Sequence, residues 1–203
     1  MNKSYELLYE CLKQIRSKTD FVPETAIVLG SGLGNFADRI TAECIIDYSD
    51  IAGFPVSTNK MHKGRFIFGS VGDKAVVAMQ GRIHFYEGYS MEQVVMPIKL
   101  MKMLGADTLI LSNAAGGINT SFQPGDLMTI TDHITSFVPS PLIGPNIDEL
   151  GTRFPDMTNV YDKDLQKIIR RCADKLGIGL KAGVYLQTTG PNYETPAEIR
   201  AYR

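Results

Sequence analysis

Short apolar segments alternate along this chain with longer segments whose apolar residues recur at helical spacing. A short apolar run bounded by glycine or proline is typical of a buried strand, and apolar residues three or four positions apart are typical of the buried face of a helix. Alternation of the two is the pattern of a sheet covered by helices. We therefore predict an α/β fold with a mixed, mostly parallel central β-sheet flanked by helices.

The predicted elements follow one another closely. We expect helices over 7–15, 91–104 and 165–176, and strands over 26–29, 65–71, 74–79, 108–111, 127–131 and 183–189. Gly72-Asp73 should join two of these strands as a hairpin, and Pro97 should bend the second helix or start a new one. The Pro- and Gly-rich stretch 139–151 is better interpreted as a functional loop than as a domain boundary. Residues 1–203 are therefore predicted to form a single domain.

The charge balance of the chain excludes a general attraction to polyanions. The chain has 21 Lys and Arg against 22 Asp and Glu, a net charge of −1, so an anion must be held by a local cluster. The N-terminal segment alternates charged and apolar residues, unlike a signal peptide, and no stretch approaches the roughly 20 apolar residues that span a bilayer. The three cysteines lack metal-ligand spacing and are expected to be reduced, mostly buried thiols. We predict a cytoplasmic protein that binds neither nucleic acid nor a membrane.

The last residues of the sequence, 195–203, have the features of a helix that has just begun. Pro196 suits a first helical turn, and Glu198 suits the positive end of a helix dipole. A natural C-terminus rarely falls at such a point. We therefore expect the sequence to be truncated at its C-terminal end.

A glycine-rich loop, LGSGLG at 29–34, directly follows the first predicted strand. Glycines let the backbone turn tightly and bring its N–H groups close to an anion, and Ser31 adds a hydroxyl donor. The third glycine comes too early for a dinucleotide-binding fingerprint, with Asn35 at the expected place. Taken alone, the loop is compatible with a structural turn, a dinucleotide loop or a phosphate loop.

A second polar segment, QGRIHFYEGY at 80–89, directly follows the third predicted strand. Arg82 and His84 are two residues apart, so their side chains should leave the same face of an extended chain, and Tyr86 continues that face. An arginine with an imidazole and a phenol nearby suits an oxyanion beside a hydroxyl-rich ligand. The alternative is a surface arginine paired with Glu87 and a histidine packed at a strand end.

Two further segments follow predicted strands. The small residues of SNAAGG at 112–117 permit close approach of the backbone to a phosphate or a flat base, although such a run alone also suits helix–sheet packing. In TGPNYET at 189–195, Tyr193 could stack on an aromatic base and Glu194 could accept a hydrogen bond from a base N–H, or else cap the next helix. Ligands of open α/β sheets gather at the carboxyl ends of strands, so we expect these loops to form one pocket.

Taken together, these four segments resemble the trimeric, low-molecular-mass purine nucleoside phosphorylases. Their order and approximate spacing match over essentially the whole chain, and Tyr193, where other members carry Phe, resembles bacterial forms. The resemblance implies a nucleoside phosphorylase-like fold and phosphorolysis of 6-oxopurine nucleosides, such as inosine and guanosine, to a free purine and ribose 1-phosphate. It implies a homotrimer that binds a purine nucleoside and phosphate.

The resemblance also implies roles for individual positions. His84 and Glu194 would be the catalytic residues, with Glu194 holding N1–H of the base. Phe154 would reach into the site of the neighbouring subunit. The remaining implied contacts are to phosphate from Ser31, His62, Arg82, His84 and the Ala114 backbone, to ribose from Tyr86, and to the base from Tyr185, Tyr193 and Glu194. The third histidine, His133, is expected to be structural or to lie at an interface.

The chemistry implied is attack by a bound phosphate on the sugar as the base departs, which needs positioning and charge stabilisation but no metal or redox cofactor. Inorganic phosphate is a co-substrate. Further contacts of the family lie beyond residue 203, so we expect these 203 residues alone to be inactive or poorly folded. The alternatives are a methylthioadenosine phosphorylase, against which Glu194 and the glycine loop argue, and a non-catalytic nucleoside-binding protein of the same fold.

Overall fold

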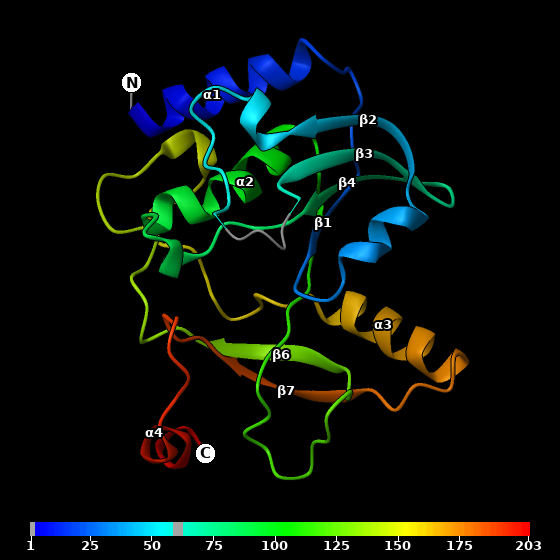
Figure 1. The fold of residues 1–203 in the computed structure, drawn as a ribbon, viewed down its shortest axis with the longest axis vertical. Helices are drawn as coiled ribbons and strands as arrows, with labels where there is room; N and C mark the ends of the chain where they lie inside the picture. The colour runs from blue at the N-terminus through cyan, green and yellow to red at the C-terminus, as the bar shows by residue number, and fades with distance from the viewer. Residues whose placement is uncertain (1–2, 59–62) are drawn as a thin grey trace. The chain divides into compact units, whose positions relative to one another are not determined.

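The computed structural model of this chain describes residues 3–58 and 63–203. The backbone forms two compact units, one ending at Ala114 and the other running from Ala115 to Arg203. Each unit has its own sheet (Figure 1). Each is described separately, and the arrangement of the chain as a single domain stays a prediction.

The first unit contains a five-stranded sheet in the order β2-β3-β4-β1-β5. In chain order its strands are β1 (Thr25–Leu29), β2 (Thr41–Asp47), β3 (Arg65–Val71), β4 (Lys74–Gln80) and β5 (Thr108–Leu111). β1 pairs in parallel with β4 and β5, whereas β3 pairs antiparallel with β2 and β4. The predicted hairpin between β3 and β4 is confirmed, with Val71 paired to Lys74 across the turn. Strand β2 was not predicted, since polar and apolar residues mix along it.

Apolar side chains from strands and helices build the core of the first unit. The strands β1, β3 and β4 are nearly continuous buried runs, as expected of strands with both faces covered. Helix α1 (Lys3–Arg16) contributes Leu8, Cys11 and Ile15, which lie on one face because they are three or four residues apart. A cluster of aromatic rings joins Tyr48, Phe54, Phe66 and Phe68, with neighbouring ring centroids 4.9–6.2 Å apart.

Helix α2 (Met91–Met103) begins where its sequence dictates. The Ser90 hydroxyl accepts a hydrogen bond from the Gln93 N–H, and the Gln93 side chain accepts one from the Ser90 N–H. Pro97 lies inside this helix and is buried, so the helix continues through it and no second helix starts there. Burial of Met96, Leu100 and Met101 on the same helix supplies the packing that offsets the lost backbone hydrogen bond.

The second unit has a smaller sheet of two parallel strands, β6 (Met128–Ile134) and β7 (Lys181–Leu186). Helix α3 (Lys163–Lys175) starts at Asp162, whose carboxylate accepts hydrogen bonds from two backbone N–H groups of the first turn. A short helix α4 (Pro196–Tyr202) follows. The expected functional loop 139–151 is irregular apart from a single turn at its end. A mixed, mostly parallel arrangement of strands flanked by helices is thus confirmed.

Burial separates the two units sharply. Among the described residues, Ala173 is the only buried apolar side chain of the second unit, while the first unit supplies all the others. The expectation of mostly buried cysteines was wrong for two of three, since only Cys11 is buried and Cys172 is exposed. Burial raises the pKa of Cys11 to about 11, so this thiol stays protonated. No helix in the described part of the chain has the length and apolar character to cross a membrane.

Candidate active site

Three neighbouring parallel strands of the first unit end at the same edge of the sheet. In the order β4-β1-β5, they continue into residues 81–84, 30–34 and 112–114. The carboxyl edge of an open α/β sheet is where such folds bind ligands. Three of the four segments singled out in the sequence therefore lie together, and we call this group of residues the anion cradle. The fourth segment belongs to the second unit, and its joining the same pocket stays a prediction.

Gly30 holds the glycine loop against the end of β5. Its N–H donates to Ser112 Oγ at 3.1 Å, and Ser112 Oγ donates to the Val28 carbonyl at 2.8 Å. A Cβ at position 30 would lie 2.2 Å from the Ser112 carbonyl oxygen and 2.7 Å from Asn113 Cα, both backbone atoms. Only glycine fits, and its fit brings two of the loops into contact.

The tip of the glycine loop presents Ser31 to solvent. Gly32 adopts a φ of 81°, a left-handed conformation that glycine reaches without strain, and the Leu33 N–H closes the turn on the Gly30 carbonyl at 3.0 Å. A short 3-10 helix, η1 (Gly34–Arg39), follows. Exposed backbone and hydroxyl donors at such a turn suit an anion.

Arg82 connects the second and third loops. Its Nη1 donates to the Ser112 carbonyl at 3.1 Å, and its Nε donates to His84 Nε2 at 3.2 Å. The Arg82 guanidinium is therefore fixed at the strand ends rather than extended into solvent. It does not pair with Glu87 as the alternative interpretation had it, because Glu87 bonds to His84 instead.

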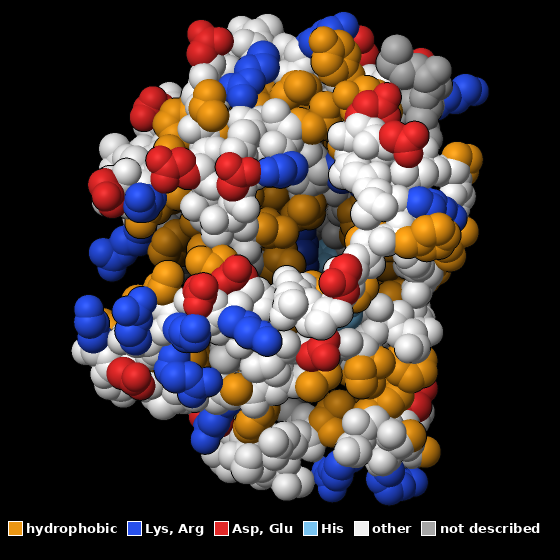
Figure 2. All heavy atoms as spheres, turned by 180° about the vertical axis from the view of Figure 1, so that it is seen from behind, with side chains coloured by type: hydrophobic (Ala, Val, Ile, Leu, Met, Phe, Trp, Pro, Cys, Tyr) orange, Lys and Arg blue, Asp and Glu red, His pale blue; other side chains and the backbone are white. Residues whose placement is uncertain are grey.

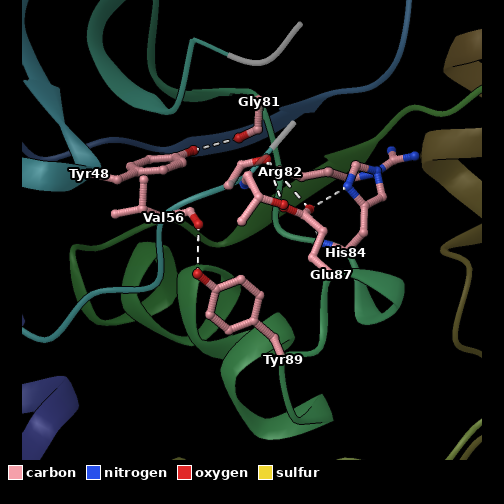
Figure 3. Close-up of polar contacts among 9 residues, drawn as sticks. Tyr48, Val56, Gly81, Arg82, His84, Glu87 and Tyr89 are labelled. Atoms are coloured by element: carbon pink, nitrogen blue, oxygen red, sulfur yellow. Dashed lines mark hydrogen bonds and ion pairs between the residues drawn. The ribbon is translucent and has the colours of Figure 1, made fainter. Parts of the chain in front are cut away.

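The hydrogen bonds of His84 determine where its proton lies. Because Nε2 accepts from Arg82, the proton of the neutral ring belongs on Nδ1, which then donates to Glu87 Oε1 at 2.9 Å. The same Oε1 accepts from the His84 backbone N–H at 2.9 Å. Figure 3 shows Arg82, His84 and Glu87 in this chain of contacts. The arrangement leaves His84 able to accept a proton at Nε2, with a carboxylate behind it to stabilise the resulting cation.

Glu87 is a site residue that the sequence analysis missed. Its side chain is 1% exposed. Burial by itself would raise the pKa of this carboxyl, but hydrogen bonds from Thr58 and His84 outweigh burial and lower the pKa to about 2. The carboxylate is thus charged at neutral pH. Its spacing of three residues from His84, across the 3-10 turn η3 (Phe85–Glu87), was the available signal.

Tyr86 and Ala114 complete the first unit's share of the predicted site. The Tyr86 ring stacks on His84, with centroids 4.9 Å apart and planes at 24°, so the predicted shared face of the two side chains holds. Tyr86 is exposed, and Ala114 is exposed at the end of the third loop. His62 lies outside the described residues.

The second unit carries the predicted base-site and subunit-contact residues. Glu194 accepts a hydrogen bond from Thr188 Oγ1 at 2.9 Å, and it does not cap α4, because Thr195 and Glu198 form that cap. Tyr193 is 93% exposed and Phe154 is 85% exposed. Tyr185 is half-buried on β7, opposite His133 on β6.

Comparison with known proteins identifies the family. Residues 24–203 match the family model described as the phosphorylase superfamily. The chain belongs to the phosphorylase superfamily. It is 52% identical over 181 residues to purine nucleoside phosphorylase 1 of Bacillus subtilis, covering 89% of this chain and 67% of that protein. It is 50% identical over 189 residues to the same-named protein of Geobacillus stearothermophilus, covering 93% of this chain and 69% of the relative.

Solved structures agree with this family assignment. A purine nucleoside phosphorylase in complex with ribose-1-phosphate superposes with a TM-score of 0.92 at 43% identity, covering 97% of this chain and 74% of that one. The Schistosoma mansoni purine nucleoside phosphorylase in complex with acetate gives 0.90 at 43% identity, covering 96% and 73%. Within the superfamily the chain is therefore a purine nucleoside phosphorylase relative, as its four segments implied.

Two other features of this superfamily member bear on ligands. Among the described residues, no group of three or more His, Cys, Asp or Glu side chains is placed to hold a metal ion. A small cavity of about 190 Å³ in the second unit is lined by residues that include Thr131, Asp132 and Tyr161, and by none of the predicted site residues. His133 donates to or accepts from Tyr161 Oη at 3.1 Å nearby, which fits its expected structural role.

Proposed function

We propose that this protein splits 6-oxopurine ribonucleosides and 2′-deoxyribonucleosides with inorganic phosphate, releasing the purine and (deoxy)ribose 1-phosphate. Two kinds of finding support this: relatives at 52% and 50% identity bear the name purine nucleoside phosphorylase, and neighbouring structures are described as complexes with ribose-1-phosphate and with hypoxanthine. The single observation that carries the proposal is the anion cradle, in which Arg82 bonds to His84 and to Ser112, and Ser112 also bonds to the glycine loop at Gly30.

Phosphate in this proposal is both nucleophile and electrostatic partner. One of its oxygens forms a bond to C1′ of the sugar while the C1′–N9 bond breaks, and the electron pair of that bond leaves with the purine. Arg82 and Ser31 hold the phosphate, together with the Ala114 backbone and His62. The negative charge of phosphate lies beneath a sugar that becomes positive in the transition state. This electrostatic stabilisation is the main contribution to the rate acceleration.

His84 and Glu87 handle the proton of phosphate. The unprotonated Nε2 of His84 exchanges its hydrogen bond from Arg82 for one from the phosphate monoanion and accepts the proton, which makes the more nucleophilic dianion. The charged Glu87 carboxylate stabilises the imidazolium through Nδ1–H. The low pKa of Glu87 keeps that carboxylate ionised throughout. Tyr86, stacked on His84, contacts the ribose.

Residues of the second unit recognise the base and the neighbouring subunit. Glu194 accepts from N1–H of a 6-oxopurine, Tyr193 stacks on the purine ring, and Tyr185 contributes to the base site. Phe154, which is exposed in the single chain, reaches into a neighbouring protomer, and the working protein is a homotrimer like the family that its segments resemble. The reaction needs no metal or redox cofactor, because phosphate and the side chains supply the charges. The enzyme acts in the cytoplasm.

The test is the absorbance change on conversion of inosine to hypoxanthine by the protein expressed from its whole reading frame. Base release that requires phosphate and yields ribose 1-phosphate is the expected result. A preference for methylthioadenosine over inosine and guanosine would replace the proposal with the methylthioadenosine reaction. Binding of inosine with no release of base at any phosphate concentration would make the protein a nucleoside-binding protein instead.

A further inference from the structure

The segment Val56–Thr58 is hydrogen-bonded along the turn that carries His84. Tyr89 Oη donates to the Val56 carbonyl at 2.6 Å. The Ser57 hydroxyl lies 3.2 Å from Glu87 Oε2 and donates to it. Thr58 donates to the same oxygen twice, from its backbone N–H at 2.5 Å and from Oγ1 at 2.7 Å. Figure 3 shows the contact of Tyr89 with Val56, and Glu87 beside His84.

Thr58 and His84 bind different oxygens of Glu87. Oε2 accepts from Thr58, while Oε1 accepts from the backbone N–H and ring Nδ1 of His84. The Ser57 hydroxyl lies between them, 3.2 Å from Oε2 and 3.4 Å from Oε1. With the Glu87 side chain 1% exposed, water has little access to replace a lost donor. Without the Thr58 hydroxyl, Oε2 would keep only the Thr58 N–H and the shared Ser57 hydroxyl among the donors of the described residues, and this weaker hold would favour rotation of the carboxylate toward its other partners. Rotation would bring Oε2 toward His84 and disturb the bond to Nδ1.

The turn itself is anchored at both ends, so it cannot absorb such a rotation. At its start, the buried Tyr48 Oη donates to the Gly81 carbonyl at 2.8 Å. At its end, Tyr89 is held by Val56. Between these anchors, the orientation of the Glu87 carboxylate is set by the donors on Oε2. The group whose state depends on that orientation is the imidazole of His84.

We propose that Thr58 is a positioning residue for His84. By occupying Oε2, it holds Glu87 in the orientation that keeps the His84 proton on Nδ1, so that Nε2 stays unprotonated and accepts from Arg82. Thr58 contacts neither phosphate nor nucleoside in this role and acts only through Glu87. The inference rests on the proposed phosphorolysis for its effect on rate, whereas its effect on the proton of His84 stands independently of any reaction.

The test compares Thr58→Val with Thr58→Ser and with Thr41→Val. Valine keeps the shape and the backbone N–H but removes the hydroxyl, whereas serine keeps the hydroxyl. Thr41 is an exposed residue of β2, an edge strand of the five-stranded sheet. Thr41→Val therefore controls for the general effect of replacing a threonine with valine. The direct readout is NMR of protein labelled with 15N in its histidines, because the ring nitrogen shifts distinguish the two neutral tautomers; the chain has three histidines.

His84 should be a single Nδ1–H tautomer in the wild type and in the Thr58→Ser and Thr41→Val variants. In Thr58→Val it should be a mixture of the Nδ1–H and Nε2–H tautomers. In the kinetic assay, Thr58→Val should lower kcat/KM for phosphate about fivefold, with KM for inosine unchanged and activity restored by serine. The melting temperature of each variant shows whether it folds normally. If Thr58→Val has a folding defect, Thr58→Ala is used as the hydroxyl-free variant instead. A single Nδ1–H tautomer in the folded hydroxyl-free variant would overturn the proposal. An altered tautomer in a protein that never releases base would instead support the positioning role and refute the proposed function.

Discussion

The two units differ in how firmly each holds the site residues predicted for it. In the first, Arg82, His84 and Glu87 are tied by hydrogen bonds to one another and to the end of β5, above a core that contains nearly all the buried apolar side chains among the described residues. In the second, Tyr193 and Phe154 are almost fully exposed, and Glu194 is held by Thr188. The predicted phosphate-binding residues Arg82 and His84 are therefore held in place by the protein itself.

The physical cause of the difference is the amount of apolar surface that each unit buries. Helix α3 is strongly amphipathic, yet Leu165, Ile168 and Ile169 on it are exposed. On α1, by contrast, Leu8, Cys11 and Ile15 are buried. Basic side chains gather on the surface over α3 (Figure 2). Rigid support fixes a binding geometry, and weak support leaves it to be completed by ligand or neighbour. The predictions below examine this contrast, beginning with the largest expected effect.

Removing the arginine of the anion cradle should have the largest effect. Arg82→Ala should lower kcat/KM for phosphate roughly 10²–10³-fold while leaving KM for inosine nearly unchanged, because the lost charge faces phosphate alone. Arg39→Ala, an exposed arginine of the same unit, is the matched control. Steady-state kinetics with each substrate varied separately provide the measurement. Equal losses for both variants would remove Arg82 from the phosphate site.

The buried carboxylate should make stability depend on pH. The pKa of Glu87 is lowered from 4.5 to about 2 in the folded state, so its stabilisation is fully present above about pH 4.5 and is lost as the pH falls toward 2. At pH 7 the unfolding free energy of the wild type should exceed that of Glu87→Gln by up to about 3 kcal/mol. This difference should shrink as the pH falls below about 5. Urea unfolding of both proteins at several pH values measures it. A margin independent of pH would contradict a charged, hydrogen-bonded Glu87.

The base-site carboxylate should show the opposite selectivity to Arg82. Glu194→Gln should reduce kcat/KM for inosine about 10²-fold and leave KM for phosphate nearly unchanged, because an amide is a weaker partner for N1–H. The same kinetic assay applies, with Glu149→Gln, an exposed residue of the second unit, as control. A loss confined to phosphate would show that Glu194 does not meet the base.

Two glycines compare the packing of the units directly. Gly30→Ala should lower the unfolding free energy by about 2 kcal/mol, because its Cβ would overlap the backbone at Ser112. Gly116→Ala in the second unit should change it by less than about 0.5 kcal/mol, since nothing lies within 4 Å of a Cβ there. Urea unfolding supplies both values. Similar losses of unfolding free energy at the two positions would contradict the inferred difference in packing between the two units.

The sequence predicted the elements more fully than the contacts. Apolar periodicity located the strands that end at the anion cradle, because β1 and β4 are buried on both faces. Strand β2 was not predicted from the sequence because it carries polar residues among its apolar ones. Glu87 was not predicted as a site residue because its role depends on donors from Thr58, 29 residues away, and no local sequence pattern indicates that pairing. The continuity of α2 through Pro97 likewise depends on tertiary packing that outweighs local propensity.

Occupation of the anion cradle is the central claim, and anomalous diffraction from arsenate, a heavier analogue of phosphate, tests it most directly. Crystals of the protein soaked with arsenate should show an arsenic peak within hydrogen-bonding distance of Arg82, His84 Nε2 and the Ser31 loop. A saturated crystal with arsenate bound elsewhere and none at these residues would contradict the account.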